Sequence, residues 1–223
     1  MVPIKENLVP KDKYAIKCPY TRTPTRVVIH NTANDAPAAN EISYMRYNDL
    51  EISFHYAVDD VNIVQGIPEN RNAWASGDGH GKGNMEGIHI EICYSKSGGE
   101  KFDKAEQNAA EFTASLLKKY GWGIDKVTKH RDYDGKYCPH RTLDRGWQRF
   151  LSMVKRYMEP AKAPVASKFT PYLIRKNCRD PLNIRKGPGT DQPIVGKAAH
   201  GEIITLISKA NDQWWLVDRK SVV

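Results

Sequence analysis

The sequence predicts an α/β fold with a mixed central sheet flanked by helices, followed by a small all-β barrel. Three observations predict this division. Strand patterns alternate with helical patterns before residue 160, only strand patterns recur after residue 170, and the Pro/Ala/Lys-rich stretch EPAKAPVASK lies between them. Alternating helices and strands are typical of a layered α/β domain, whereas closely spaced strands without helices are typical of a barrel. We therefore expect domains at 1–159 and 170–223, joined by a linker at 160–169.

Strand patterns in the first domain are short and rich in β-branched residues. They are RVVIH at 26–30, the pair SFHYAV at 53–58 and NIVQ at 62–65, and GIHIEICY at 87–94. The first pattern predicts a buried strand with His30 at its end. The pair flanks Asp59-Asp60 and predicts a hairpin. The last pattern alternates strictly, which places its isoleucines on one face of the sheet and His89 and Glu91 on the other.

Helical spacing of apolar residues occurs in three segments of the first domain. They are residues 37–48, 103–120 and 143–158. For the second helix we expect Asp103 to cap the N-terminus, with Glu106 three residues on, and Gly121 to end it. Pro160 is expected to end the third helix.

The composition excludes several classes of protein. In 223 residues there is no apolar run of about 18, so no membrane insertion is expected. The N-terminus MVPIKENLVPKDKY lacks the apolar region of a secretory signal, and none is expected. The four cysteines are widely spaced and do not predict a disulfide framework.

Positive charge gathers at the C-terminal end of the chain. The net charge is +8, and residues 161–223 hold 11 Lys and Arg against 5 Asp and Glu. Such a basic module suits an anionic polymer, either a cell-wall polymer or a nucleic acid. A basic surface that only improves solubility is the alternative.

Two histidines and a cysteine form a candidate metal site. His30 ends a strand pattern, and His130 and Cys138 lie eight residues apart in TKHRDYDGKYCPH. Catalytic zinc usually takes three imidazole, thiolate or carboxylate ligands and leaves a fourth position to water. His140 is a rival ligand, but a Cys-x-His pair does not easily bind one ion with both side chains. We expect His140 to belong to the surrounding loop.

Five segments, in this order, resemble the zinc-dependent N-acetylmuramoyl-L-alanine amidases of the peptidoglycan recognition protein superfamily, and phage endolysins of Gram-positive hosts above all. They are VVIHNT, SFHYAVDD, NIVQGIPENRNAW, GNMEGIHIEICYS and KHRDYDGKYCP, within residues 20–160. The resemblance implies an enzyme that cleaves the amide between the lactyl group of N-acetylmuramic acid and L-alanine in peptidoglycan. It also implies Zn²⁺ as cofactor, held by His30, His130 and Cys138.

The same resemblance assigns two catalytic residues. Glu91 would act as general base and then general acid, and Lys136 would stabilise the oxyanion beside the metal. Some members of the family have a tyrosine at the position of Phe54, so that hydroxyl is missing from this sequence. Its absence places more of the proton transfer on Glu91.

Three further residues are expected to contact substrate. Trp74 could stack on a sugar, although packing in the core is the commoner role for a tryptophan. The family often has histidine after this tryptophan, but here the residue is Ala75. His80, in the Gly-rich loop SGDGHGKGN, is a candidate replacement, and His89 shares the face of Glu91.

The C-terminal segments LNIRKGPGT, VGKAAHGEIITLI and QWWLV resemble bacterial SH3 domains, which bind cell walls. Such domains usually continue into another Gly-Trp-containing strand, whereas this sequence stops at 218–223. We therefore expect a barrel that is either truncated or closed differently.

Three classes of function remain to be compared. The first is a monomeric phage endolysin that stays in the host cytoplasm until a holin opens the membrane and then acts on the cell wall. A host autolysin of the same chemistry is its near alternative. The second is a protein that binds peptidoglycan without cleaving it; such relatives typically lack the cysteine ligand, and Cys138 is present. The third is a nucleic-acid-binding protein, for which the sequence offers charge but no reader motif.

Overall fold

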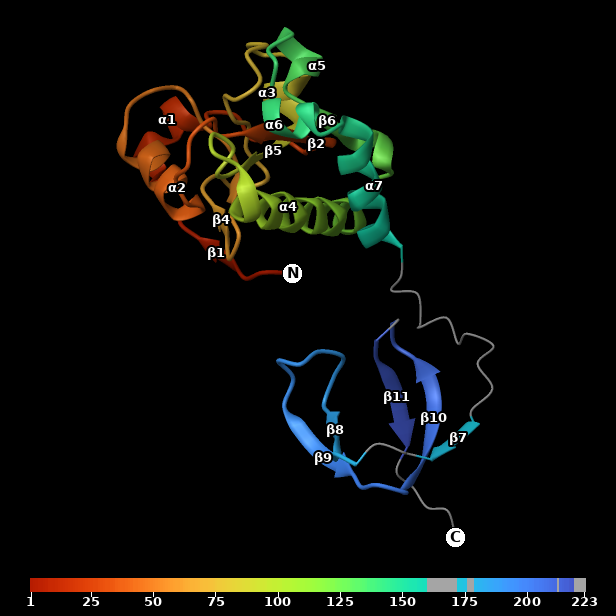
Figure 1. Cartoon of the computed structure of the whole chain (residues 1–223). Coiled ribbons are helices and arrows are strands. Elements are labelled where there is room, and N and C mark those ends of the chain that lie inside the picture. Colours follow the sequence, from red (N-terminus) through yellow and green to blue (C-terminus); the bar gives the residue numbers. More distant parts are fainter. Residues whose placement is uncertain (160–171, 176–178, 212, 219–223) are drawn as a thin grey trace. The chain divides into compact units, whose positions relative to one another are not determined.

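The computed structural model describes residues 1–159, 172–175, 179–211 and 213–218. The chain divides into two compact units, Met1–Pro160 and Ala161–Val223 (Figure 1). The linker predicted at 160–169 lies outside the described residues. Each unit is considered by itself below.

A six-stranded mixed sheet forms the centre of the first unit, as predicted. Its order is β1-β4-β3-β5-β2-β6. The strands are β1 (Ile4–Glu6), β2 (Arg26–Asn31), β3 (Tyr56–Val58), β4 (Ile63–Gln65), β5 (Gly87–Ile92) and β6 (Val127–Lys129). Strands β3, β5, β2 and β6 run parallel to one another, and β4 pairs antiparallel with β3. The predicted hairpin is thus β3–β4.

Alternation along the central strands separates a core face from a polar face. On β5 the core contains Ile88, Ile90 and Ile92, and His89 and Glu91 belong to the opposite face. On β2 the core likewise takes Val27 and Ile29 and leaves the alternate residues to the polar face. The sheet therefore presents its polar residues together on one side.

Helices cover the sheet and complete the first unit. They are α1 (Tyr14–Lys17), α2 (Ala38–Tyr47), α3 (Lys82–Glu86), α4 (Gly99–Tyr120), α5 (Arg131–Asp134), α6 (His140–Asp144) and α7 (Trp147–Met158), with 3-10 turns at Lys11–Lys13 and Ile124–Lys126. Helix α4 is the longest and packs against α7, β3 and β5 (Figure 1). Its buried stripe includes Phe102, Phe112 and Leu116, which join the apolar face of the sheet in one core.

Two predicted helix boundaries are wrong for identifiable reasons. Helix α4 begins at Gly99, after Gly98, so Asp103 does not cap it; the Asp103 carboxylate instead lies 2.6 Å from the Arg145 guanidinium. The predicted helix at 143–158 is two helices, because Gly146 adopts φ +98, a left-handed conformation that interrupts the helical hydrogen bonding. Gly121 does end α4 as predicted, in the left-handed conformation.

The second unit is rich in β structure, as predicted. Its strands are β7 (Tyr172–Arg175), β8 (Leu182–Arg185), β9 (Ile194–Ala198), β10 (Ile203–Lys209) and β11 (Trp215–Asp218). The order β11-β10-β7 makes one antiparallel sheet and β8-β9 another. The strands described in this unit therefore do not close into one continuous barrel, in agreement with the expectation of a barrel that is truncated or closed differently.

None of the helices described in either unit has both the length and the apolar character that crossing a bilayer requires.

One partly buried carboxylate ties the end of α4 to the sheet. Glu69 accepts hydrogen bonds from the Tyr56 hydroxyl on β3 (2.6 Å), from the Lys119 ammonium (2.6 Å) and from the Tyr120 hydroxyl. Burial opposes the ionisation of Glu69, but these three donors outweigh it and hold the carboxyl pKa below its ordinary value. The ionised form of Glu69 therefore stabilises the first unit.

Replacing Glu69 should have an effect on stability that depends on pH. Because the folded-state pKa is depressed, the stabilisation is present above the unfolded-state value and is lost as pH falls through the folded-state value. We expect Glu69→Gln to lower the free energy of unfolding by about 2 kcal/mol at pH 7, with the difference shrinking at acid pH. Urea unfolding at several pH values measures this, with exposed Glu51→Gln as control. An equal loss at every pH would contradict it.

Candidate metal-dependent active site

Three parallel strands bring the predicted site residues to one edge of the sheet. His30 is the penultimate residue of β2, and His130 directly follows β6. Glu91 on β5 is the register partner of His30. Since β2 pairs in parallel with both β5 and β6, the carboxyl ends of all three strands meet. This is where α/β sheets usually bind ligands.

Backbone and amide hydrogen bonds hold the loop that carries Cys138, between α5 and α6. The Arg131 backbone N–H donates to the Cys138 carbonyl at 3.0 Å. The side-chain oxygen of Asn31, the last residue of β2, accepts the backbone N–H groups of Arg141 (3.0 Å) and Thr142 (3.2 Å) in the first turn of α6. Asn31 therefore fixes the cysteine loop to the strand that carries the first histidine.

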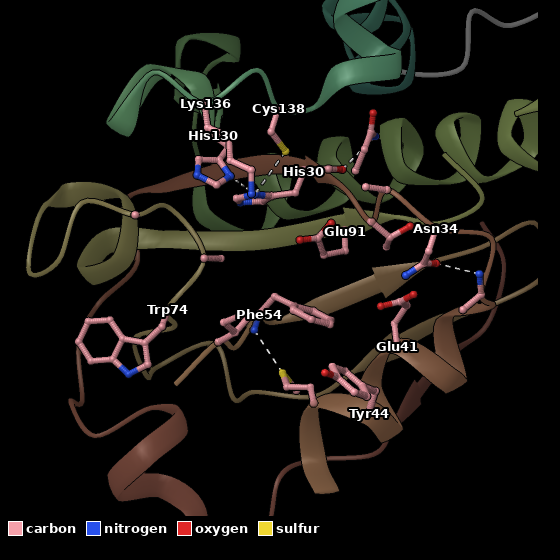
Figure 2. Close-up of a pocket in the computed structure, with 18 of the residues that line it drawn as sticks. His30, Asn34, Glu41, Tyr44, Phe54, Trp74, Glu91, His130, Lys136 and Cys138 are labelled. Atoms are coloured by element: carbon pink, nitrogen blue, oxygen red, sulfur yellow. Dashed lines mark hydrogen bonds between the residues drawn. The ribbon is translucent and has the colours of Figure 1, made fainter. Parts of the chain in front are cut away.

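The three predicted ligands converge on one point. Their ligand atoms all lie within 4.8 Å of one another. The Nδ1 atoms of His30 and His130 are 3.1 Å apart, and the Cys138 Sγ lies 4.0 Å from the His30 Nδ1 (Figure 2). Ligand atoms around a tetrahedral zinc ion are separated by about 3.4 Å, from the usual bond lengths. Both the spacing and the N/N/S donor set therefore fit zinc.

Burial keeps the three side chains proposed as metal ligands in their uncharged forms. Desolvation lowers the pKa of His30 well below its ordinary value, and it also lowers the pKa of His130 despite the nearby Asp134 carboxylate. Desolvation, with the Glu91 carboxylate as a smaller cause, raises the pKa of the Cys138 thiol to about 12. The neutral imidazoles are ready to bind a metal, whereas the thiol must release its proton when it does so.

Asp134 supports the second histidine and was not predicted. Its carboxylate lies 3.1 Å from the His130 Nε2, the ring nitrogen that faces away from the other ligands. A carboxylate behind a ligating imidazole fixes its tautomer and orientation. The spacing of four residues between Asp134 and His130 was a signal that sequence analysis could have used.

Glu91 and Lys136 lie in the same pocket as the ligand group, which consists of His30, His130 and Cys138. Desolvation, together with the nearby Glu41 carboxylate, raises the pKa of Glu91 to about 8, and Lys136 acts in the opposite direction. The Glu91 Oε2 is buried and has no hydrogen-bond partner among the described residues. The Lys136 side chain is exposed at the pocket rim, where its charge also acts on His30, His130 and Cys138.

The pocket has a volume of about 920 Å³ and lies between the ligand group and α2. Figure 2 shows Trp74 on one side, Glu41 and Tyr44 of α2 on the other, and Phe54 between them. Sequence analysis missed Glu41, Tyr44 and Asn34. The polar residues Glu41 and Tyr44 are three apart in a helix whose Ile42 and Met45 enter the core, and this spacing could have indicated a helix face turned toward the site.

The residues predicted to contact substrate occupy three different positions. Trp74 lines the pocket, and its indole N–H donates to the Ile16 carbonyl at 3.0 Å. His80 is exposed outside the pocket lining, with its Nε2 3.3 Å from the Tyr20 hydroxyl. His89 is wholly buried behind His30, so the structure contradicts the expected contact between His89 and substrate. The alternation of side chains along the strand predicted correctly which face of the sheet His89 occupies, but it did not predict how deeply His89 is buried.

The structure places the remaining candidates as the sequence suggested. His140 is outside the ligand group, and its Nε2 lies 3.2 Å from the Ser95 carbonyl, in agreement with a role in the surrounding loop. Phe54 lines the pocket beside the site and offers no hydroxyl there.

Comparison with known proteins agrees with this geometry. The family model described as N-acetylmuramoyl-L-alanine amidase matches residues 20–141. The chain belongs to the N-acetylmuramoyl-L-alanine amidase family. The predicted resemblance is thereby confirmed at the level of the family. A second family model, described as a bacterial SH3 domain, matches residues 180–222 of this amidase-family chain.

Two relatives of this amidase-family chain are proteins of Bacillus subtilis (strain 168). It is 51% identical to the N-acetylmuramoyl-L-alanine amidase XlyB over 181 residues, which are 78% of this chain and 57% of XlyB. It is 46% identical to the N-acetylmuramoyl-L-alanine amidase CwlA over 218 residues, 94% of this chain and 78% of CwlA. The solved structure of PlyL is similar, with 53% identity and a TM-score of 0.67, and the match covers 68% of this chain and 96% of PlyL.

The ligand assignment predicts one bound zinc ion per chain. We expect Cys138→Ser to weaken zinc binding at least about tenfold, since the thiolate is replaced by a poorer ligand, and His140→Ala to leave it unchanged. Equilibrium dialysis against zinc, with metal analysis of the protein, measures both. An equal loss of zinc in the two variants would contradict the choice of Cys138 over His140.

Proposed function

We propose that this chain hydrolyses the amide bond between the lactyl group of N-acetylmuramic acid and L-alanine in peptidoglycan, using one zinc ion. The observation that carries the proposal is the convergence of two imidazoles and a thiol within 4.8 Å, in a pocket that also contains Glu91. Membership of the amidase family supports the substrate class. The names of XlyB and CwlA support the same bond.

His30, His130 and Cys138 would hold the zinc. When bound, zinc supplies a Lewis acid that polarises the scissile carbonyl and makes water acidic enough to ionise near neutral pH. An amide is a poor electrophile with a poor leaving group, so the protein must also transfer protons and stabilise an oxyanion. Other residues of the pocket perform that work.

Glu91 is suited to transfer the protons. Its buried carboxyl has a raised pKa, so its ionised form is a stronger base than the carboxylate of an exposed glutamate. It would accept a proton from the attacking water and then give one to the alanine nitrogen. Lys136, at the pocket rim, would place its ammonium near the developing oxyanion. Phe54 provides no hydroxyl for either step.

The pocket is large enough for more of the substrate than the scissile bond. Trp74 would contact a sugar or the peptide from one side of the pocket (Figure 2). His80 lies outside the pocket lining but close to Trp74, with their ring centroids 5.6 Å apart. His80 would contact the substrate only where the peptidoglycan strand extends over this rim.

The second unit is proposed to bind the cell wall. Two features support this: the match to the bacterial SH3 domain model and the excess of Lys and Arg over Asp and Glu in residues 161–223. An anionic wall polymer is the ligand that this charge favours. Together the units would make a wall-degrading enzyme, either a phage endolysin released by a holin or a host autolysin of the same chemistry.

Replacing Glu91 tests the proposed reaction. Glu91→Gln should keep the zinc but lose about 10²- to 10⁴-fold in turnover, because the general base is removed and the shape is kept. The measurement is the release of L-alanine amino groups from purified Gram-positive peptidoglycan. Exposed Glu100→Gln on α4 is the matched control. Normal turnover in Glu91→Gln would rule out the proton-transfer role.

The same assay separates cleavage from binding alone. If the unmodified chain carries zinc and binds peptidoglycan but releases no amino groups, the protein is a peptidoglycan-binding protein and the proposed reaction is wrong. If it releases amino groups only with zinc, the amidase reaction is supported.

Removing residues 161–223 tests the role of the second unit. We expect the shortened chain to hydrolyse a soluble muropeptide at the rate of the full chain, because the proposed catalytic residues all belong to the first unit. Lysis of whole cells and binding to purified walls should both decrease. Wall binding that stays at the level of the full chain would contradict a wall-binding role.

A further inference from the structure

Behind His30 lies a second buried histidine that the proposed reaction does not use. The His89 Nδ1 is 2.9 Å from the His30 Nε2, and their ring centroids are 5.1 Å apart. Both side chains are buried, with 0% exposure for His89 and 1% for His30. The other ring nitrogen of His30, Nδ1, is the one that lies beside His130 and Cys138.

This contact bears on which nitrogen of His30 can bind a metal. A neutral imidazole carries one proton, so Nδ1 has a free lone pair only when the proton is on Nε2. The His30 Nε2–H then needs an acceptor, and among the described residues the hydrogen-bond partner of this nitrogen is the His89 Nδ1. His89 must in turn carry its own proton on Nε2.

The surroundings of His89 favour that arrangement. The Gly83 carbonyl oxygen lies on the far side of the ring, near Nε2 but outside hydrogen-bonding geometry. A Cβ built on Gly87 would lie 2.5 Å from the Gly83 carbonyl oxygen and 3.3 Å from the His89 Nε2, so both atoms adjoin the same glycine.

His55 holds His89 in place from β3's side of the sheet. The His89 backbone N–H donates to the His55 Nδ1 at 3.0 Å, and the two rings stack at 5.6 Å with 17° between their planes. The His55 Nε2 lies 2.9 Å from the Arg71 carbonyl, to which it donates. Arg22 also lies 2.9 Å from this nitrogen and disfavours protonation of the ring. A run of three histidines therefore extends from the Arg71 carbonyl to the ligand group.

The energetics argue against a packing role for His89. Its Nε2 is buried and makes no hydrogen bond of regular geometry among the described residues. A buried polar atom left without a firm partner costs about 1–3 kcal/mol. An apolar side chain of similar volume would avoid that cost, so the value of a histidine at this position lies in its Nδ1.

We propose that His89 is a positioning residue, which holds His30 in the tautomer and orientation that present Nδ1 to the metal. The proposal rests on the zinc site of the proposed function. Hydrogen bonds behind metal-ligating histidines have this effect generally, and their loss typically weakens metal binding about 10- to 100-fold.

Two replacements of His89 separate positioning from packing. His89→Leu removes the acceptor and fills the space, whereas His89→Asn keeps a short side-chain oxygen that can accept from the His30 Nε2. Zinc affinity is measured by competition with a chromogenic chelator. We expect it to fall about 10- to 100-fold in His89→Leu and to stay within about threefold of the unmodified chain in His89→Asn. Exposed His200→Leu in the second unit is the control and should bind zinc as the unmodified chain does.

Two further measurements on the metal-free protein complete the test. The melting temperature of His89→Leu should equal or exceed that of the unmodified chain, because the unpaired nitrogen is gone. Long-range ¹H–¹⁵N spectra should place the His30 proton on Nε2 in the unmodified chain and show a mixture of tautomers in His89→Leu.

Several outcomes would overturn the proposal. Unchanged zinc affinity in His89→Leu would do so, as would a proton on the His30 Nδ1 of the unmodified chain. If His89→Leu and His89→Asn lost the same metal-free stability as each other and the same zinc affinity as each other, the role of His89 would be packing. A complete lack of zinc binding by the unmodified chain would instead refute the proposed metal site, and the spectra of the metal-free protein would still decide the role of His89.

Discussion

The whole site depends on strand β2 being hydrogen-bonded on both sides by parallel strands. Pairing with β5 sets His30 opposite Glu91, and pairing with β6 brings His130 to the same edge. Parallel strands share one direction, so three segments far apart in the sequence end at one place. The helices α4 and α7 cover the opposite, apolar face and make this sheet the rigid base of the pocket.

Low polarity around this base has two effects that act together. It keeps the imidazoles of His30 and His130 neutral, as metal binding requires, and it raises the pKa of Glu91, as proton transfer near neutral pH requires. Lys136 partly offsets the second effect from the pocket rim. The same burial that costs stability for polar groups thus provides the chemical properties of the site.

The sequence predicted strands β2 to β5, the main helices and the grouping of His30, His130 and Cys138, because these depend on local periodicity and on a distinctive set of side chains. It did not predict the short strands β1 and β6. It predicted the face of His89 correctly, since side-chain alternation follows from strand geometry alone. It did not predict that His89 lies behind His30, because depth is decided by packing between distant segments. The break at Gly146 was missed for the related reason that the flanking apolar spacing remains helical on both sides.

Asn31 has an effect that reaches beyond the strand it ends. Its amide oxygen holds the first turn of α6, and so the Cys138 loop is ordered by bonds within the protein. Small zinc domains fold only when the ion binds, and their affinity for metal includes the cost of ordering the chain. Here that cost is met during folding of the sheet, so the site is preorganised. An ion bound there would encounter a receptor that is already shaped, and it would not need to act as the scaffold.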